Sequence, residues 1–422
     1  EIIPFIGLSS SQHQQPTAGN NSTTSTTTAR ELSIDALPES IRQNCLSVRI
    51  ENDDGLSSSH SVDKSFHVHT FRLNDEEACI EEIDPASGGS GGDDEWTAGC
   101  DNLTLPHKNL HGLWENLIFD KSLKRQILDY ASTALLFADR EVSSHIVHWN
   151  RILLLHGPPG TGKTSLARAL AHKLSIRLGH RFPRSCLLEI HSHSLFSKWF
   201  STSGKLVSAL FTMVRDMVED DPTTLVFVLV DEVESLAGTR GGGANGDPAD
   251  ATRAVNALLT SLDRLRRFPN VMVLTTTNLT NSVDDAFIDR VDMKVHVGNP
   301  NLEARTMILM SALEELRRVA IVKDDDCDTN SDAGDSQMFH EEHKHEHTTS
   351  DEPSSKRVDS PSSLLSSCAI QTEGLSGRAL RRLPLQAFSQ FLGGVEGPIS
   401  TVEFLHAVSS AIRAEQQARE SL

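Results

Sequence analysis

Apolar and polar positions alternate in two short stretches near the start of the chain. Residues 46–50 and 66–73 place apolar side chains largely at every second position, which predicts strands with one buried face. Residues 1–30 are instead mostly Ser, Thr, Gln, Asn and Gly, and such a segment cannot bury enough apolar surface to offset the entropy of ordering. We therefore expect a disordered tail over residues 1–40 and a partial N-terminal α+β domain over residues 41–84.

Further along the chain, strand patterns alternate with helical patterns. Helical patterns cover residues 127–137 and 165–174. Patterns of buried strands cover residues 151–156, 225–230 and 270–278. Strands that alternate with helices predict a parallel α/β sheet. We expect the large domain built on this sheet to span residues 103–300.

The C-terminal third of the chain predicts helices only. Residues 301–322 and 373–422 have helical patterns, and the last helix opens with a capping box from Ser400 to Glu403. We assign residues 301–422 to a helical lid domain, interrupted by a disordered acidic insert over residues 323–360. The insert carries histidines at a spacing that a metal could use, but its low complexity favours disorder over a metal site: His340, His343, His345 and His347.

Composition places the acidity outside the two predicted domains. The 422 residues carry a formal net charge of −19, with 38% hydrophobic and 5% aromatic residues. Residues 1–120 contribute −14 and residues 323–360 contribute −8, which leaves +3 for the rest. Residues 85–102 form a flexible acidic linker rich in Gly and Ser. No basic cluster appears, which argues against sequence-independent binding of nucleic acid.

The apolar runs of the chain do not indicate a membrane protein. The longest apolar run, residues 225–230, has the length of a strand, and no run approaches the 18 residues or more that a membrane span requires. The chain opens on Glu1 without an initiating Met, so we expect it to be a fragment.

A glycine-rich segment at residues 157–164, G-P-P-G-T-G-K-T, stands between a predicted strand and a predicted helix. This is the context of a P-loop, in which backbone N–H groups and the helix N-terminus surround phosphate oxygens. Lys163 would reach the β and γ phosphates of ATP, and the Thr164 hydroxyl would bind Mg²⁺. The predicted nucleotide-binding residues are Gly157, Pro158, Pro159, Gly160, Thr161, Gly162, Lys163, Thr164 and Ser165.

Two carboxylates follow the buried strand pattern at residues 225–230. Asp231 and Glu232 would lie at the carboxyl edge of the sheet, where α/β proteins bind ligands. Asp231 would hold Mg²⁺, and Glu232 would polarise the attacking water. The alternative is a pair of solvated carboxylates at a strand end, which the nearby P-loop makes the weaker interpretation.

Three further residues are candidates for the reaction. Asn278 follows the next strand, where its amide could orient water, although a turn-forming Asn would also occupy this place. Arg290 is either a surface residue or an arginine finger that acts on the ATP of a neighbouring subunit. Arg378 could reach from the lid to the γ phosphate, whereas Arg381 and Arg382 are expected to be solvated.

Two adjacent aromatic side chains lie in a polar segment. Trp199 and Phe200 follow Lys198 in S-L-F-S-K-W-F-S, and exposed aromatic residues indicate contact with a partner, although burial in the core is the alternative. The glycine-rich residues 238–248 predict a loop rather than a second phosphate site, because no Lys-Ser or Lys-Thr pair follows them.

Five segments together resemble the AAA+ ATPases, and among them the family of pachytene checkpoint protein 2 and thyroid hormone receptor interactor 13. They are H-G-L-W-E-N-L-I-F-D (residues 111–120), H-G-P-P-G-T-G-K-T-S-L (156–166), H-S-H-S-L-F-S-K-W-F-S-T-S-G-K-L-V (191–207), F-V-L-V-D-E-V-E-S-L (227–236) and E-G-L-S-G-R-A-L-R-R-L-P (373–384). The resemblance covers residues 103–422, and the third and fifth segments are its most specific parts.

The resemblance implies roles for these residues. It makes Glu232 the catalytic base, Asn278 sensor 1, Arg290 an arginine finger and Arg378 sensor 2. Lys198, Trp199 and Phe200 match the pore loop that grips a substrate chain. Residues 41–84 correspond to part of the family's substrate-docking domain.

The resemblance also implies a function. We expect a homo-hexameric ring that uses ATP and Mg²⁺ to convert HORMA-domain proteins from a closed to an open form by pulling the chain through its pore. The family acts in meiotic recombination, chromosome-axis control and spindle-checkpoint silencing, and an adaptor delivers the mitotic substrate. We accordingly expect the protein in the nucleus, on chromosomes, and in the cytoplasm.

Two other functions fit parts of the sequence. One is an AAA+ motor that acts on a different protein or, like a clamp loader, on nucleic acid, which the missing basic groove disfavours. The other is a nucleotide-gated scaffold without catalysis, which would require a defective catalytic set, and the sequence shows no such defect.

Overall fold

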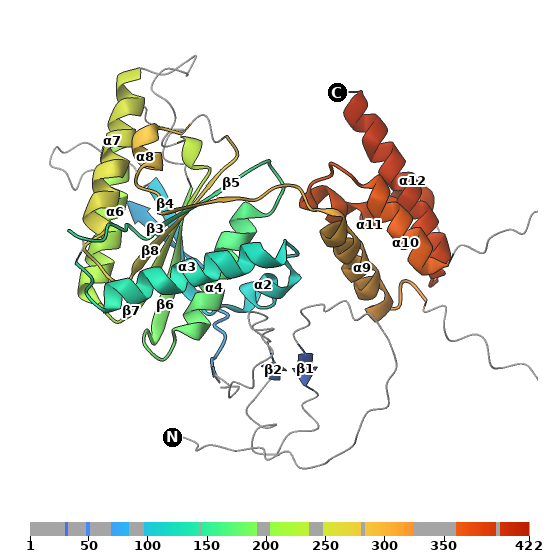
Figure 1. Ribbon diagram of the computed structural model, residues 1–422, viewed down its shortest axis with the longest axis horizontal. Helices are drawn as coiled ribbons and strands as arrows, with labels where there is room; N and C mark the ends of the chain where they lie inside the picture. The colour runs from blue at the N-terminus through green and yellow to red at the C-terminus, as the bar shows by residue number, and fades with distance from the viewer. Residues whose placement is uncertain are drawn as a thin grey trace, which may run out of the picture. The chain divides into compact units, whose positions relative to one another are not determined.

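The chain divides into two compact units, Glu1–His67 and Val68–Leu422. In the described part of the first unit, strand β1 (Arg30–Leu32) pairs antiparallel with strand β2 (Val48–Ile50). The computed structural model (Figure 1) describes residues 30–32, 48–50, 69–83, 97–143, 145–191, 203–235, 248–279, 283–323, 360–393 and 397–421.

The N-terminal predictions hold only in part. β2 lies within the first predicted strand, but β1 falls inside the predicted tail. Of the strand predicted at residues 66–73, only residues 69–73 are described, and they do not form a strand. The backbone there finds a neighbour just beyond this stretch, where Asn74 N donates to Pro106 O at 2.8 Å. Among the described residues, no strand pairs with residues 69–73, so the alternating pattern alone did not make them a strand.

A seven-stranded sheet forms the centre of the second unit. Its strand order is β3-β4-β6-β7-β8-β5-β9. The pairs β6–β7, β7–β8, β8–β5 and β5–β9 are parallel, whereas the pairs β3–β4 and β4–β6 are antiparallel. The bounds are β3 Cys79–Ile83, β4 Thr97–Leu105, β5 Ile152–His156, β6 Arg184–His191, β7 Thr224–Asp231, β8 Val271–Thr277 and β9 Met293–His296. The predicted parallel sheet is confirmed, with an antiparallel extension at one edge.

That extension moves the start of the large domain. β3 lies in the segment assigned to the N-terminal domain, and residues 97–102 of β4 lie in the predicted linker. β4 pairs with β6 through the register Cys100↔Ile190, and Cys100 is 1% exposed. The linker prediction is therefore wrong at residues 97–102, because the neighbouring strand orders a sequence whose own polar composition favours a loop.

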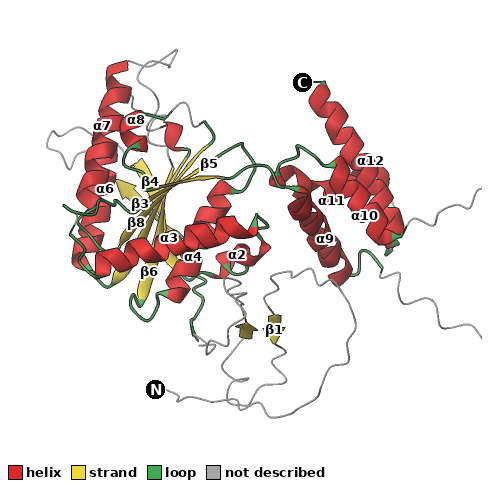
Figure 2. Cartoon of the chain, in the orientation of Figure 1, coloured by secondary structure: helices red, strands yellow, loops and turns green. Residues whose placement is uncertain are grey.

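Helices cover both faces of the sheet (Figure 2). Helices α3 (Lys121–Asp139) and α4 (Lys163–Arg177) pack on one face, where Leu153, Leu155 and Phe227 are buried. Helices α6 (Ser203–Asp220), α7 (Pro248–Leu265) and α8 (Asp285–Ile288) pack on the other, against Leu154 and Val228. Successive side chains of a strand point to opposite faces, so strands covered on both sides are apolar throughout. Short elements complete the domain: η3 Lys108–Leu110, α2 Leu113–Asn116 and η4 Val233–Ser235.

In the described residues of the lid, the helices are α9 (Leu302–Arg318), α10 (Pro361–Gln371), α11 (Gly377–Phe391) and α12 (Thr401–Glu420). As predicted, Ser400 caps α12, since its hydroxyl accepts from Glu403 N at 3.1 Å. Helix α10 was not predicted, although Ser360 caps it and Pro361 stands at its first position. Residues 324–359, most of the predicted insert, lie outside the described residues. No helix in the described part of the chain is long and apolar enough to cross a membrane.

Candidate nucleotide-binding site

The P-loop connects β5 to α4, as the sequence predicts. Gly157 has φ +145°, and a Cβ at this position would lie 2.3 Å from the carbonyl oxygen of Val297. Gly160 has φ +76°, and a Cβ there would meet the Ser376 hydroxyl at 2.9 Å. Both positions therefore require glycine, and the resulting loop presents its backbone at the N-terminus of α4, where N–H groups can bind phosphate oxygens.

Lys163 lies inside this loop. It is 6% exposed, and its Nζ donates to Gly157 O at 2.9 Å and to Pro158 O at 2.8 Å. Burial lowers its pKa, while the carboxylates of Glu234, Asp231 and Glu232 act in the opposite direction. The ammonium group is thus held at the phosphate-binding loop by backbone carbonyls that a phosphate could replace as partners.

A hydrogen-bonded network joins the end of β7 to the P-loop and to β8. Asp231 Oδ1 accepts from Thr164 Oγ1 at 2.8 Å and also from Thr276 Oγ1. Glu232 N donates to Thr276 Oγ1 at 3.1 Å. The structure therefore brings together Thr164, Asp231 and Glu232 and adds Thr276, which sequence analysis missed. The only sequence signal for Thr276 is its place near the carboxyl end of a buried strand.

Glu234 is a second residue that the sequence analysis did not single out. Its Oε1 accepts from Asn278 N at 3.1 Å, so it holds the chain where β8 ends. Its buried Oε2 has no hydrogen-bond partner among the described residues.

The backbone of the neighbouring Glu232 has φ +55°, an uncommon conformation for a residue other than glycine. Asn278 thus lies beside the carboxylate segment, and its function as a water-orienting amide stays a prediction.

The lid contacts the P-loop through the start of α11. Arg378 N donates to Gly160 O at 3.0 Å, and a Cβ at Gly160 would lie 3.3 Å from Arg378 Cβ. The Arg378 side chain is exposed, and its charge is one of the causes, after burial, that lower the Lys163 pKa. The structure thus places Arg378 at the phosphate-binding loop. Arg381 is exposed, as expected, and also donates to the carbonyl of Asn116.

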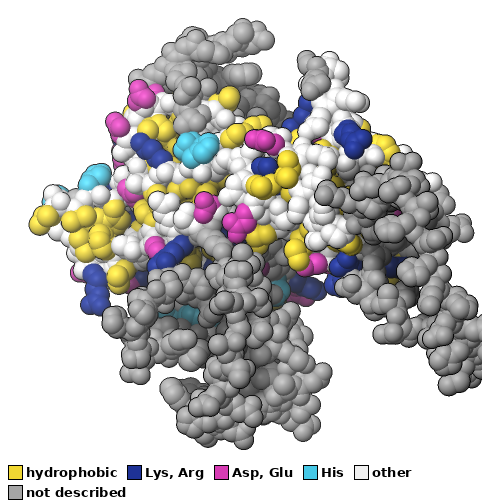
Figure 3. Space-filling view, turned by 45° about the vertical axis from the view of Figure 1, so that its right-hand side comes forward, with side chains coloured by type: hydrophobic (Ala, Val, Ile, Leu, Met, Phe, Trp, Pro, Cys, Tyr) yellow, Lys and Arg dark blue, Asp and Glu magenta, His cyan; other side chains and the backbone are white. Residues whose placement is uncertain are grey.

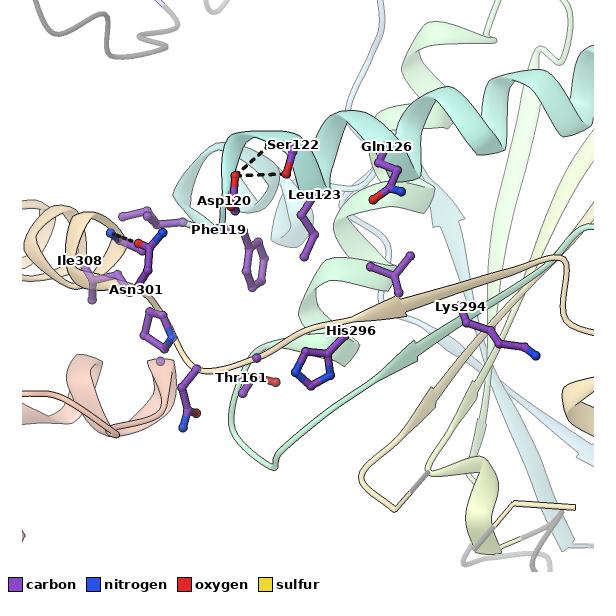
Figure 4. Close-up of a pocket in the computed structure, with 17 residues that line it drawn as sticks. Phe119, Asp120, Ser122, Leu123, Gln126, Thr161, Lys294, His296, Asn301 and Ile308 are labelled. Carbon is purple, nitrogen blue, oxygen red and sulfur yellow. Dashed lines mark hydrogen bonds between the residues drawn. The ribbon is translucent and has the colours of Figure 1, made fainter. Parts of the chain in front are cut away.

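A cavity of 390 Å³ adjoins the P-loop. Figure 4 shows Phe119, Thr161 and His296 around it. Apolar side chains of the segment before α3 and of α9, among them Ile118 and Ile308, line it together with polar groups of residues 298–301. A cavity with apolar walls and a few polar groups fits a heterocyclic base, with the phosphates directed toward Lys163.

Two histidines lie next to each other at the ends of β5 and β9, beside the P-loop. The rings of His156 and His296 are 5.1 Å apart between centroids, with an interplanar angle of 51°. Burial, followed by the charges of His296 and Lys163, lowers the pKa of His156. A neutral His156 at this position avoids a further positive charge beside Lys163.

Arg290 lies at the other edge of the sheet. Its carbonyl accepts from Asn150 Nδ2 at 2.8 Å, just before β5 begins, whereas the P-loop follows the end of β5. Its guanidinium donates to both oxygens of Asp263 at 2.9 Å and to Ala286 O at 2.7 Å. The structure therefore separates Arg290 from the nucleotide site of its own chain by the length of a strand.

Two predicted regions lie outside the described residues. They are the candidate pore loop, with Lys198, Trp199 and Phe200, and the glycine-rich residues 238–247. Pro248, the last residue of the predicted loop, begins α7.

Figure 3 shows the charged side chains of the described residues on one face of the molecule. Lys and Arg side chains are interspersed there with Asp, Glu and apolar side chains, and they form no continuous tract on this face.

Models of two protein families match the chain. Residues 153–299 match the ATPase family associated with various cellular activities (AAA). Residues 301–416 match the TRIP13-like AAA+ ATPase lid C-terminal domain. The large domain and the lid are thus both similar to AAA+ domains.

Similar proteins span nearly the same region. The pachytene checkpoint protein 2 homolog of Oryza sativa subsp. indica is 44% identical over 356 residues, which are 82% of this chain and 71% of that protein. The Homo sapiens homolog is 42% identical over 357 residues, 84% of this chain and 77% of that protein. The structure of C. elegans PCH-2 has a TM-score of 0.64 at 34% identity and covers 83% of this chain and 79% of that chain.

A more distant structure shares the fold. A chain of the HORMA:CdnC:Trip13 complex of E. coli has a TM-score of 0.53 at 16% identity, and the match covers 73% of this chain and 93% of that chain.

Proposed function

Because this chain belongs to the pachytene checkpoint protein 2 family and is an AAA+ ATPase, we propose that it uses ATP hydrolysis to convert HORMA-domain proteins from a closed to an open form. The observation that supports this proposal best is the complete network of Thr164, Asp231, Thr276 and Glu232 at the P-loop. A scaffold that only binds nucleotide would not need Glu232.

The residues of this chain divide the work at the phosphates. Lys163 exchanges its two carbonyl partners for phosphate oxygens. Glu232 polarises the attacking water, and Asn278 orients it. Arg378 enters the same site from the lid, so that hydrolysis alters the contact between α11 and the P-loop.

The donor groups also fit Mg²⁺. Thr164 Oγ1 and Asp231 Oδ1 lie 2.8 Å apart, and hydroxyl and carboxylate oxygens are the ligands that Mg²⁺ takes in phosphate sites. When bound, the ion would neutralise phosphate charge.

The proposal includes a homo-hexameric ring. Arg290 lies too far from the P-loop of its own chain to act there, so it requires a second copy in a heterologous contact, and such contacts build a ring when the rotation between copies closes. In the ring, Lys198, Trp199 and Phe200 grip the substrate. An adaptor delivers the mitotic substrate, and the protein works in meiotic recombination and spindle-checkpoint silencing in the nucleus, on chromosomes and in the cytoplasm. One relative's structure contains HORMA and Trip13 together, which supports this choice of substrate.

The test is ATP hydrolysis with and without a closed HORMA-domain protein, combined with an assay for the open form. We expect the substrate to stimulate hydrolysis and to open. Glu232→Gln should still bind ATP but lose both activities, while Glu219→Gln on the surface of α6 serves as the matched control. Trp199→Ala should hydrolyse ATP without opening the substrate. Hydrolysis that neither responds to the HORMA-domain protein nor opens it would contradict the proposal.

A further inference from the structure

Arg290 is held by an ion pair with defined geometry. Nε donates to Asp263 Oδ1 and Nη2 to Asp263 Oδ2, both at 2.9 Å, so the carboxylate binds one edge of the planar guanidinium at two points. Nη1 donates to Ala286 O at 2.7 Å. Asp263 lies in the last turn of α7, and Ala286 lies in α8, so two separate elements hold the same side chain.

These contacts leave part of the guanidinium available. The group has five N–H donors, and three hydrogen bonds to acceptors in its own chain are present. The Arg290 side chain is 29% exposed. The remaining N–H groups, on Nη1 and Nη2, can therefore meet an acceptor from outside the chain without breaking the pair with Asp263.

Several charged side chains surround the ion pair between Arg290 and Asp263. Asp263 lines a cavity of 250 Å³ with Trp149, Arg151, Arg266 and Arg267. Without the carboxylate, Arg290 would lose two hydrogen bonds and its paired charge. Asp284 and Asp289 also lie close enough to interact with Arg290.

We propose that Asp263 is a positioning residue, which fixes the Arg290 guanidinium so that its outward N–H groups meet the phosphates of ATP in the neighbouring subunit. This inference rests on the proposed function, in which Arg290 acts on that ATP. An unrestrained arginine has many rotamers, and misplacing a catalytic group by about 1 Å can cost a hundredfold in rate.

The first experiment measures steady-state ATP hydrolysis by Asp263→Ala, Arg290→Ala and the double variant. We expect Arg290→Ala to lower kcat by about 10³-fold, and Asp263→Ala to lower kcat by about tenfold with little change in the KM for ATP. The double variant should be no slower than Arg290→Ala, because Asp263 acts only through Arg290. Asp263→Glu should recover part of the loss. A further drop in the double variant, or an unchanged kcat in Asp263→Ala, would overturn the proposal.

The matched control is Glu315→Ala. Glu315 pairs with Arg318 at two points on α9, at 2.6 and 2.8 Å, and both side chains are exposed. Its loss should leave kcat unchanged, which separates the position of Asp263 from the general effect of removing a surface ion pair.

The second experiment uses rings purified through two different tags, one on Asp263→Ala subunits and one on Glu232→Gln subunits. The first kind keeps Glu232 and the second keeps the Asp263–Arg290 pair, so mixed rings should hydrolyse ATP faster than either variant alone. If Asp263→Ala only impaired the folding of its own subunit, the mixed rings would not be faster than the single variants. Mixed rings without this gain in rate would overturn the proposal.

Mixed rings of Arg290→Ala and Glu232→Gln subunits test the action of Arg290 between subunits separately from the positioning of Arg290 by Asp263. Rescue there but not with Asp263→Ala would reject the positioning residue alone. No rescue in either mixture would reject Arg290 as a group that acts between subunits, and with it this part of the proposed function.

Discussion

The two ends of strand β5 use carboxylates in different ways. Beyond His156, Asp231 accepts from the hydroxyls of Thr164 and Thr276, and the groups for binding phosphate are assembled within one chain. Before Ile152, Asp292 instead accepts backbone N–H groups, from Asn150 at 2.8 Å and from Arg151 at 2.6 Å. One end is built to receive a ligand, whereas the other is fixed internally and presents Arg290 outward.

The difference extends to the buried cations. Lys163 has two carbonyl partners that a ligand can displace. Arg151 is 3% exposed and donates to the carbonyls of Val271, Arg266 and Phe268 at 2.8 to 2.9 Å. Burial lowers the pKa of Arg151 to about 10, which keeps it charged at neutral pH. Arg151, a buried cation with three carbonyl partners inside the fold, is therefore structural, whereas Lys163 at a glycine-rich loop is available for phosphate.

The largest effect should follow from Gly157→Ala at the nucleotide end. The new methyl group would clash with the Val297 backbone, and the φ of +145° is unfavourable for Ala, so the P-loop cannot keep its shape. We expect titration with a fluorescent ATP analogue to show no measurable binding. Gly374→Ala is the matched control: φ is +80° there, but no described atom lies within 4 Å of the added Cβ. It should bind ATP normally and lose about 1 kcal/mol of stability. An equal loss of ATP binding in Gly157→Ala and Gly374→Ala would contradict this prediction.

Thr276→Val should lower kcat about a hundredfold, since it removes the hydroxyl that joins Asp231 to the Glu232 backbone. The neighbouring hydroxyl of Thr275 donates to Leu153 O at 2.9 Å within the sheet. Thr275→Val should therefore cost stability but keep kcat. Steady-state ATP hydrolysis and thermal unfolding of both variants test this prediction. Equal kcat values for Thr276→Val and Thr275→Val would show that hydrolysis does not need the hydrogen bonds of the Thr276 hydroxyl.

His172, in the helix that follows the P-loop, should make stability depend on pH. It is 4% exposed, and burial, with a smaller effect of His111, lowers its pKa from 6.5 to about 4. The unfolded chain then binds the proton more tightly, so the stability from a neutral His172 is complete above pH 6.5 and is lost as pH falls toward 4. Between pH 7 and pH 5 the wild type should lose about 2 kcal/mol more than His172→Gln in urea unfolding. Parallel pH profiles would refute this assignment.

The smallest effect concerns the other end of β5. Asp292→Asn keeps an acceptor but loses the charge that holds Asn150 N, Arg151 N and the Tyr130 hydroxyl. We expect unfolding free energy to fall by about 1 kcal/mol and the Kd for ATP to stay unchanged. A weaker Kd would show that the two ends of β5 are coupled.

Local sequence was enough to predict the parts of the site that are continuous in the chain. The P-loop needs glycines at Gly157 and Gly160 for conformations that other residues rarely adopt, and buried strands are apolar throughout. These requirements act on neighbouring residues, so they leave a readable pattern. The same holds for the caps at Ser360 and Ser400, although only the second was recognised.

Tertiary structure alone decided which distant residues meet. Nothing in the local pattern distinguishes Thr276 from Thr275, or Asp263 from other exposed acidic residues. Parallel pairing of β7 with β8 brings Thr276 to Asp231, and the packing of α7 beside α8 brings Asp263 to Arg290. β4 likewise became a strand only because β6 lies beside it. The sequence by itself determined a phosphate-binding loop with its carboxylates, because their chemistry requires particular residues at fixed spacing. The partners of those residues depend on contacts between elements far apart in the chain, which only the fold specifies.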